Sequence, residues 1–194
     1  LTTRRQRQMC IRDREKDVLL HFPYHTFDYT VDLLREAAID PQVASIKMTL
    51  YRAAQKSNVI NALISAAENG KHVTAVLEPR ARFDEEANIY WANELQKAGA
   101  QVIFGVPGLK VHSKLCLITR RDGRKKVRFA YISTGNFNEK TALIYSDTSL
   151  LTADRNITLE VNKVFDFFEN NYNLPTYNRL IIAPHHTRKK INRL

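Results

Sequence analysis

Cysteine and long apolar runs are scarce in this sequence, and each scarcity excludes a class of protein. Two cysteines in 194 residues, Cys10 and Cys116, provide neither a disulfide framework nor the spacing of a metal-binding motif. No apolar run approaches the length of a membrane-spanning helix, and the basic, polar N-terminus does not resemble a signal peptide. The composition predicts a protein of the reducing cytoplasm, with a membrane-peripheral location as the alternative.

The size of the chain limits the number of domains, and its charge limits the kinds of binding partner. A hydrophobic content of 44% in 194 residues is enough for one cored domain and too little for two large ones. The formal net charge of +10 indicates an anionic partner. On this ground alone, the partner is a nucleic acid, a membrane surface or polyphosphate.

The first thirteen residues differ in character from the rest. Residues 4–13 contain four arginines without periodicity, and they resemble the translation of a transposase adapter used in sequencing libraries. We therefore expect residues 1–13 to be a non-native, adapter-derived segment and the sequence to be a gene fragment, a genuine basic arm being the alternative. Without these residues the chain keeps 26 basic and 19 acidic side chains, a formal net charge of +7.

Strand-like and helix-like segments alternate along the chain, which predicts an α/β fold with a mixed, mostly parallel sheet flanked by helices. The expected strands are 17–22, 43–51, 72–77 and 101–104, and the expected helices are 28–38, 59–67 (capped by Ser57) and 84–98. A hairpin then follows, with strands 113–119 and 127–133 around the favoured turn pair Asp122-Gly123. Strand 147–151 and helix 157–168 complete one domain, and no internal repeat appears.

His112 stands apart from the other five histidines because of its neighbours. Lys110 and Lys114 flank it two residues away on either side, so an extended backbone places all three side chains on one face. Two ammonium groups disfavour protonation of the imidazole and attract phosphate oxygens, which suits a neutral nucleophile for phosphoryl transfer. The alternative is a histidine at a strand edge among solvated lysines.

The segment Ser133 to Asn138 follows the hairpin and has the composition of a phosphate-holding loop. It offers hydroxyl, backbone and amide donors, and Gly135 permits close approach of a ligand. Hairpin pairing returns this segment to the level of His112, and residues 139–141 are expected to open a helical turn whose N-terminus faces an anion. The alternative is a turn with an Asx cap.

Two arginines occupy equivalent places in the predicted sheet. Arg52 follows one predicted strand, and Arg82 follows the strand that ends at Leu77. Ligands of open α/β sheets bind at the carboxyl ends of strands, where a planar guanidinium can clamp phosphate. Either arginine alone is more often a surface residue, but two at equivalent strand ends favour a phosphate site.

The His-x-Lys and Gly-Asn motifs together resemble one half-site of the phospholipase D superfamily. Longer segments, taken in order, resemble the first C-terminal catalytic domain of bacterial polyphosphate kinases. These segments are 17–20, 24–27, 51–52, 81–88, 107–114, 134–142 and 145–154. The resemblance implies a phospholipase D-like catalytic domain over residues 14–178, with 179–194 as the truncated start of the second catalytic domain.

The resemblance also implies a reaction. The terminal phosphoryl group of ATP passes reversibly to His112, which becomes a phosphohistidine with Lys114 beside it, and then to the end of a polyphosphate chain. ATP, ADP and polyphosphate are therefore the implied substrates, and Mg²⁺ is the implied cofactor. Tyr145 matches a nucleotide-contacting tyrosine. Arg52 and Arg82 match magnesium positions, but guanidinium has no lone pair for a metal, so we expect both to hold phosphate oxygens around Mg²⁺. Further candidates for phosphate binding are Lys110, Gly135, Asn136 and Asn138.

Two departures limit what the resemblance implies. The superfamily pattern places an aspartate where this chain has Thr119, which disfavours hydrolytic phosphodiesterase activity. The family's second catalytic domain, which completes the active site, is absent, so we expect the fragment alone to be inactive. The resemblance also implies that the full-length parent is a homo-oligomer without a specific nucleic-acid partner. The alternatives are a phospholipase D-like phosphodiesterase and a non-catalytic polyanion-binding module.

Overall fold

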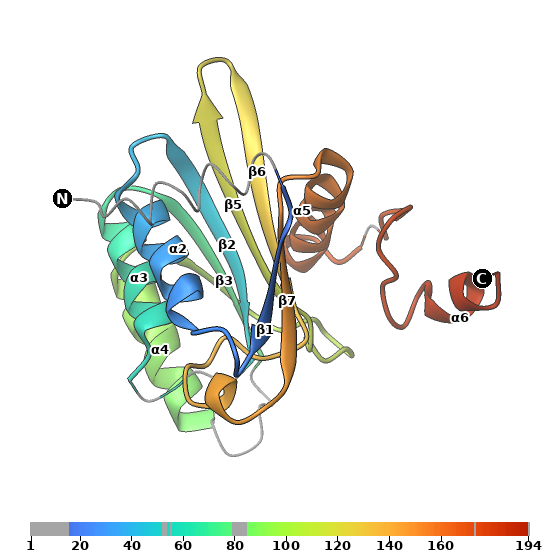
Figure 1. The fold of residues 1–194 in the computed structure, drawn as a ribbon, viewed down its shortest axis with the longest axis horizontal. Coiled ribbons are helices and arrows are strands. Elements are labelled where there is room, and N and C mark those ends of the chain that lie inside the picture. Colours follow the sequence, from blue (N-terminus) through green and yellow to red (C-terminus); the bar gives the residue numbers. More distant parts are fainter. Residues whose placement is uncertain (1–15, 52–53, 55, 79–84, 173, 194) are drawn as a thin grey trace.

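A seven-stranded mixed sheet forms the centre of the computed structural model, which describes residues 16–51, 54, 56–78, 85–172 and 174–193 (Figure 1). The adapter-like segment 1–13 lies outside these residues. The strands are β1 (Val18–Phe22), β2 (Val43–Leu50), β3 (His72–Leu77), β4 (Gln101–Phe104), β5 (Lys114–Asp122), β6 (Lys125–Ser133) and β7 (Asp147–Thr152). Their order across the sheet is β1-β7-β6-β5-β2-β3-β4, so β5 lies at the middle.

The mixed α/β class is confirmed, but the sheet is not mostly parallel. Among the described strands, β2, β3 and β4 pair in parallel, whereas β1 with β7, β7 with β6, β6 with β5, and β5 with β2 are antiparallel. Alternating β and α segments account only for the parallel part. The β5–β6 hairpin and the return of β7 then add antiparallel strands to the open edge of β2.

Helices cover both faces of this sheet, as predicted. Figure 1 shows α2 (Asp28–Ile39), α3 (Asn58–Glu68) and α4 (Glu85–Lys97) on one face and α5 (Arg155–Glu169) on the other. Two buried apolar clusters follow this division: a larger one that includes Ile46 and Leu63, and a smaller one in which Phe165 of α5 packs with the β5 residue Leu117. None of the helices in the described ranges has the length and apolar character required to cross a bilayer.

Local hydrogen bonds explain where several elements begin. The hydroxyl of Ser57 accepts from Ile60 N at 3.2 Å, which confirms the predicted cap of α3. The hairpin turn lies one residue later than expected: Asp122 pairs with Lys125, so Gly123 and Arg124 form the loop, and Gly123 has the positive φ of +60° that glycine permits.

The segment after α5 contains a repeat that the sequence analysis missed. Residues 180–187 and 19–26 share the pattern Leu-x-x-x-Pro-x-His-Thr. The same backbone hydrogen bond closes both turns, from His25 N to His21 O at 2.8 Å and from His186 N to Ile182 O at 2.9 Å. The first copy leads from β1 into α2, and the second leads into the short α6 (Thr187–Ile191).

The buried carboxylate of Glu160 on α5 fixes the start of this segment. It accepts from the backbone N–H groups of Asn178 at 2.6 Å, Arg179 at 2.9 Å and Leu180 at 2.7 Å. Burial alone would raise the pKa of Glu160, but these hydrogen bonds and the charge of Lys190 together hold that pKa below its ordinary value of 4.5.

We predict that Glu160→Gln releases residues 178–180 locally. An uncharged amide accepts these bonds less strongly, so hydrogen exchange at the three amides should speed up by about tenfold or more. Because the folded pKa is lowered, the stabilisation is fully present above the ordinary glutamate pKa and is lost as the pH falls through the folded value. Exchange that is unchanged in the variant would contradict this role, and Glu169→Gln on the same helix is the control.

Candidate active site around His112

The backbone on both sides of His112 is held by side chains of β2 and the end of β3. The hydroxyl of Thr49 donates to Ser113 O at 2.7 Å and accepts from Leu115 N at 2.9 Å. On the other side, Val111 N donates to the buried carboxylate of Glu78 at 2.7 Å. The backbone of His112 is thus fixed in position, while its side chain is only partly covered and remains accessible to solvent.

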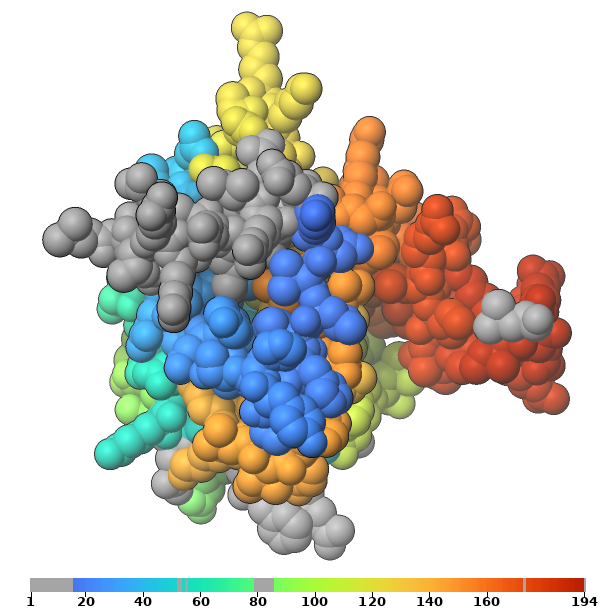
Figure 2. All heavy atoms as spheres, viewed as in Figure 1, coloured from blue at the N-terminus to red at the C-terminus, as the bar shows by residue number. Residues whose placement is uncertain are grey.

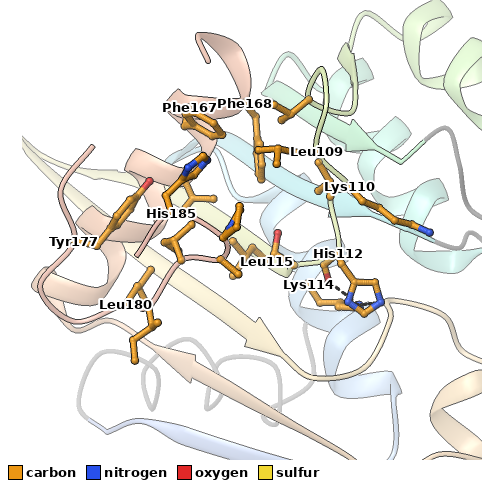
Figure 3. Close-up of a pocket in the computed structure, with 18 of the residues that line it drawn as sticks. Leu109, Lys110, His112, Lys114, Leu115, Phe167, Phe168, Tyr177, Leu180 and His185 are labelled. Carbon is orange, nitrogen blue, oxygen red and sulfur yellow. Dashed lines mark hydrogen bonds between the residues drawn. The ribbon is translucent and has the colours of Figure 1, made fainter. Parts of the chain in front are cut away.

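Lys110, Lys114 and Tyr51 surround the imidazole of His112. Lys114 Nζ lies 3.1 Å from both ring nitrogens and donates to His112 O at 2.6 Å (Figure 3). The Tyr51 ring meets the imidazole edge-on at a centroid distance of 5.0 Å, and each lysine Nζ lies 5.3 Å from the centroid of that ring. The spacing in the sequence predicted that the two lysines accompany His112 but gave no sign of the contact with Tyr51.

The surroundings of His112 favour a neutral imidazole. Partial burial lowers the pKa of His112 below 6.5, and the charges of Lys114 and then Lys110 lower it further. The ring therefore keeps one unprotonated nitrogen near neutral pH. Such an imidazole is a competent nucleophile beside two cations that attract anionic oxygens.

The loop after β6 returns to the level of His112, as hairpin pairing predicted. Lys114 at the start of β5 lies opposite Ser133 at the end of β6. The Ser133 hydroxyl accepts from Gly135 N at 3.0 Å and from the Ser149 hydroxyl at 2.8 Å. A Cβ on Gly135 would lie 2.3 Å from an Asp147 carboxylate oxygen, so only glycine fits this turn.

The expectation that residues 139–141 present a free helix N-terminus is wrong. The Asn138 side-chain oxygen accepts from Lys140 N at 3.0 Å and Thr141 N at 3.2 Å, which is the Asx cap named as the alternative. A 3₁₀ turn, Thr141–Leu143, follows. Asn136 lies in the same loop, and its buried Oδ1 accepts no hydrogen bond from the described residues.

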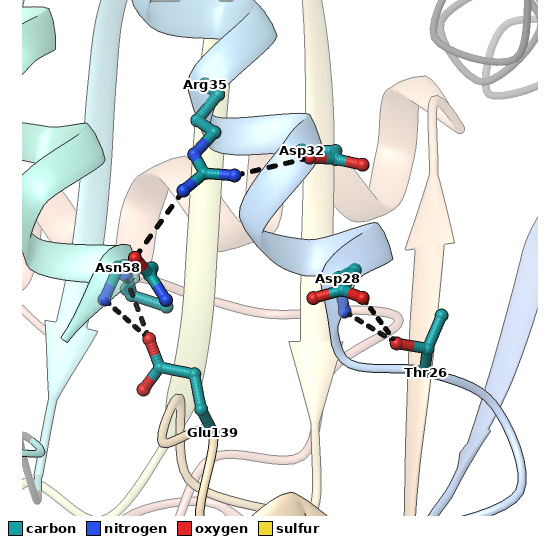
Figure 4. Close-up of polar contacts among 7 residues, drawn as sticks. Thr26, Asp28, Asp32, Arg35, Asn58 and Glu139 are labelled. Atoms are coloured by element: carbon teal, nitrogen blue, oxygen red, sulfur yellow. Dashed lines mark hydrogen bonds and ion pairs between the residues drawn. The ribbon is translucent and has the colours of Figure 1, made fainter.

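Glu139 ties this loop to α3. Its carboxylate accepts from Asn58 N at 2.6 Å and Val59 N at 3.2 Å, and Arg35 donates to the Asn58 side chain at 3.4 Å (Figure 4). The negative carboxylate at the N-terminus of α3 is favourable with the helix dipole. The loop that faces His112 is therefore anchored to the helical layer.

A cavity of about 580 Å³ opens beside His112. Figure 3 shows His112 and Lys114 at one end and Phe167 and His185 at the other. The apolar wall consists mainly of side chains from the loop before β5, from α5 and from the C-terminal segment, among them Leu109, Val164, Phe168, Leu180 and Ile182. The neighbours of His185 in the sequence did not set it apart from the other histidines, but the structure places it on the same cavity as His112.

The remaining predicted residues are not brought to His112 by any described contact. Arg52 and Arg82 lie outside the described residues. Tyr145 follows the 3₁₀ turn and is 59% exposed, beside the exposed Leu143 and Ile144. Within the described ranges, no group of three or more His, Cys, Asp or Glu side chains is arranged to hold a metal ion.

The fold of this chain is phospholipase D-like. The structure superposes on Nuc from Salmonella typhimurium, a phospholipase D family member, with a TM-score of 0.60 over 85% of this chain and 99% of that chain, at 16% identity. At that identity, the likeness concerns the fold alone.

Closer relatives identify the family. The family described as polyphosphate kinase C-terminal domain 1 matches residues 9–174, so the chain belongs to this family. It is 56% identical over 176 residues to a polyphosphate kinase of Salmonella typhimurium and 55% identical to one of Escherichia coli, covering 91% of this chain but 26% of each relative. The crystal structure of polyphosphate kinase from Porphyromonas gingivalis superposes on the whole chain with a TM-score of 0.86 and 40% identity, covering 33% of that chain. The chain thus spans about a quarter of the length of these curated relatives.

We predict that His112 titrates below the ordinary histidine pKa of 6.5, and that Lys110→Gln raises this value. Removal of the exposed Lys110 charge eliminates one repulsion with the imidazolium and leaves the backbone anchors in place. The pKa is measured by NMR titration of the His112 ring protons. A pKa at or above 6.5 in the unchanged protein would contradict the electrostatic description, and Lys97→Gln is the control.

Proposed function

We propose that this domain carries the nucleophile of a polyphosphate kinase active site, with His112 as the residue that is phosphorylated. A ring nitrogen of His112 attacks the terminal phosphorus of ATP, the bond from that phosphorus to the bridging oxygen breaks, and ADP leaves. A terminal oxygen of polyphosphate then attacks the phosphohistidine and regenerates the free imidazole. The main support is the position of His112 between two lysines, with Lys114 Nζ 3.1 Å from both ring nitrogens and Lys110 Nζ over the Tyr51 ring that contacts the imidazole.

The neighbouring loop and cavity support phosphate binding at this position. Lys114 and Lys110 are placed to attract the phosphoryl oxygens as the new bond forms. The turn at Gly135 brings backbone close to the same strand ends, and we assign Asn136 and Asn138 to the loop that borders the phosphates. In this arrangement Tyr145 contacts the nucleotide from the end of the 3₁₀ turn.

Magnesium fits this site only together with phosphate. The described side chains that surround the imidazole of His112 (Lys110, Lys114 and Tyr51) are cationic or neutral, and cations do not attract a bare Mg²⁺ ion. We therefore propose that Mg²⁺ arrives bound to ATP and that Arg52 and Arg82 hold phosphate oxygens around it. When bound, the ion neutralises charge on the transferred group.

We also propose that this domain is part of a longer chain. We assign residues 14–178 to the catalytic domain and 179–194 to the start of a second one, because 180–187 repeats the pattern that begins the first. We propose that the second domain completes the site. We place the parent in the cytoplasm as a homo-oligomer that acts on ATP and polyphosphate.

A phospholipase D-like phosphodiesterase is the second candidate, favoured by the fold of Nuc. Thr119 stands where the superfamily pattern has an aspartate, and its register partner in the sheet is Arg128, which adds no acid. Metal-independent cleavage of a phosphodiester by the parent enzyme would favour this candidate over phosphoryl transfer.

We predict that His112→Gln abolishes covalent labelling of the full-length parent by ATP labelled at the terminal phosphate. Glutamine cannot form a phosphoramidate, so a label that is stable in base and labile in acid should disappear. His185→Gln, on the far side of the same cavity, is the matched control and should keep the label. An equal label in the His112 variant would reject the assignment.

We predict that Tyr145→Leu weakens ATP binding more than it slows phosphoryl transfer. Stacking of a base on an aromatic ring contributes about 1–3 kcal/mol, so the KM for ATP in the parent should rise about tenfold with a smaller change in kcat. Tyr172→Leu removes another exposed tyrosine and serves as the control. A fall in kcat at constant KM would instead indicate a role in the chemical step.

A further inference from the structure

The β5–β6 hairpin concentrates positive charge far from His112. Residues 120–128 hold six basic side chains and one acidic side chain, so they supply half of the formal net charge of +10. β5 begins two residues after His112, and its nine residues span roughly 27 Å at about 3.4 Å per step, so the turn lies at the opposite end of the strand from His112. The tip of the hairpin projects beyond the rest of the molecule (Figures 1 and 2).

Several of these cations share the face of the sheet that α5 covers. Leu117 and Ala130 of the two strands pack in the cluster of α5, so the alternation along each strand places Arg121, Lys126 and Arg128 on the same side. Arg155 in the first turn of α5 joins them. Lys126, Arg128 and Arg155, together with Lys125, border a shallow hollow of about 560 Å³ whose other lining residues are uncharged: Val127, Ala153, Thr158 and Leu159.

Three of these cations differ from Arg120 of the same hairpin in their lack of an ion pair with a described carboxylate. Arg120 pairs with Asp40 at 2.9 Å, whereas no carboxylate among the described residues forms an ion pair with Arg121, Lys126 or Arg155. Arg121 and Lys126 are direct cross-strand partners, and like charges in such positions destabilise a hairpin. An anion bound across this face would remove that repulsion.

The surroundings distinguish between kinds of polyanion. Single-stranded nucleic acids bind through aromatic side chains on which the bases stack, in addition to basic residues. None of the described residues that line the hollow is aromatic, and Phe129 of β6 lies on the other face, beside Leu33 of α2. The surface therefore matches a chain of phosphates without bases.

We propose that this face of the hairpin, formed by Arg121, Lys126, Arg128 and Arg155, is a second binding site for the polyphosphate chain. It holds a distant part of the polymer while the end of the chain reacts at His112. This inference rests on the proposed function for its ligand, but it concerns a separate surface and does not use the catalytic residues.

The test compares two triple variants of the 194-residue chain that remove the same charge. The hairpin variant is Arg121→Gln, Lys126→Gln and Arg155→Gln, and the control is Arg188→Gln, Lys189→Gln and Arg193→Gln; all six side chains are exposed. Binding of long-chain polyphosphate is measured by calorimetry over a range of salt. In the hairpin variant the dissociation constant should rise at least about tenfold, and the slope of log K against log salt should fall by about 2, whereas the control should change much less.

Each alternative outcome has a definite meaning. Equal losses in the two variants would show that only net charge matters and would overturn the site. An equal loss of binding to a homopolymeric single-stranded DNA would assign the surface to nucleic acid instead. If His112→Gln leaves the labelling of the parent unchanged but the hairpin variant still loses polyphosphate binding selectively, the proposed function fails while the second site stands. Circular dichroism of both variants confirms that they fold.

Discussion

The antiparallel insertion of β5 between β2 and β6 is the constraint on which the site depends. β5 starts where both of its neighbours end, with Lys114 opposite Ser133. The end of β2 therefore delivers Tyr51, and the end of β6 delivers the loop after Ser133, to the segment that carries His112. Thr49 holds the junction through hydrogen bonds on both sides of Lys114. A slip of one residue would turn His112 and Lys114 together to the opposite face of the sheet and separate them from Tyr51 and the loop after Ser133.

Local sequence patterns predicted the elements well but not their arrangement. The strands at 72–77 and 101–104 coincide with the prediction because their apolar residues are flanked by clear breaks. β5 extends three residues beyond the end of the predicted strand 113–119, to Asp122. The sequence did not indicate this extension because polar, exposed strand residues carry no alternating apolar pattern. The central position of β5 depends on pairing between segments far apart in the sequence, which no local window contains.

The residues of the site also divide into those that local sequence groups together and those that only the tertiary fold brings together. Sequence spacing was enough to group His112 with its two lysines, because an extended segment places alternate side chains on one face. Tyr51, Glu78 and His185 reach the site only through the topology of the sheet and the path of the C-terminal segment. Glu160 is an ordinary polar position in the predicted helix, and its role depends on three amides about twenty residues later in the chain.

The charge distribution around His112 also bears on reversibility in the proposed reaction. Partial burial and the two lysine cations together keep the imidazole neutral. In the proposed reaction these cations gain a favourable partner when a phosphoryl group becomes attached, which stabilises the phosphorylated state relative to the free one. If that stabilisation were too large, the phosphohistidine would accumulate and transfer to polyphosphate would slow. Lys114 is buried and donates to the His112 backbone, whereas Lys110 is exposed and screened by solvent. One fixed and one screened cation stabilise the intermediate less than two buried cations would, which suits a step that must proceed in both directions.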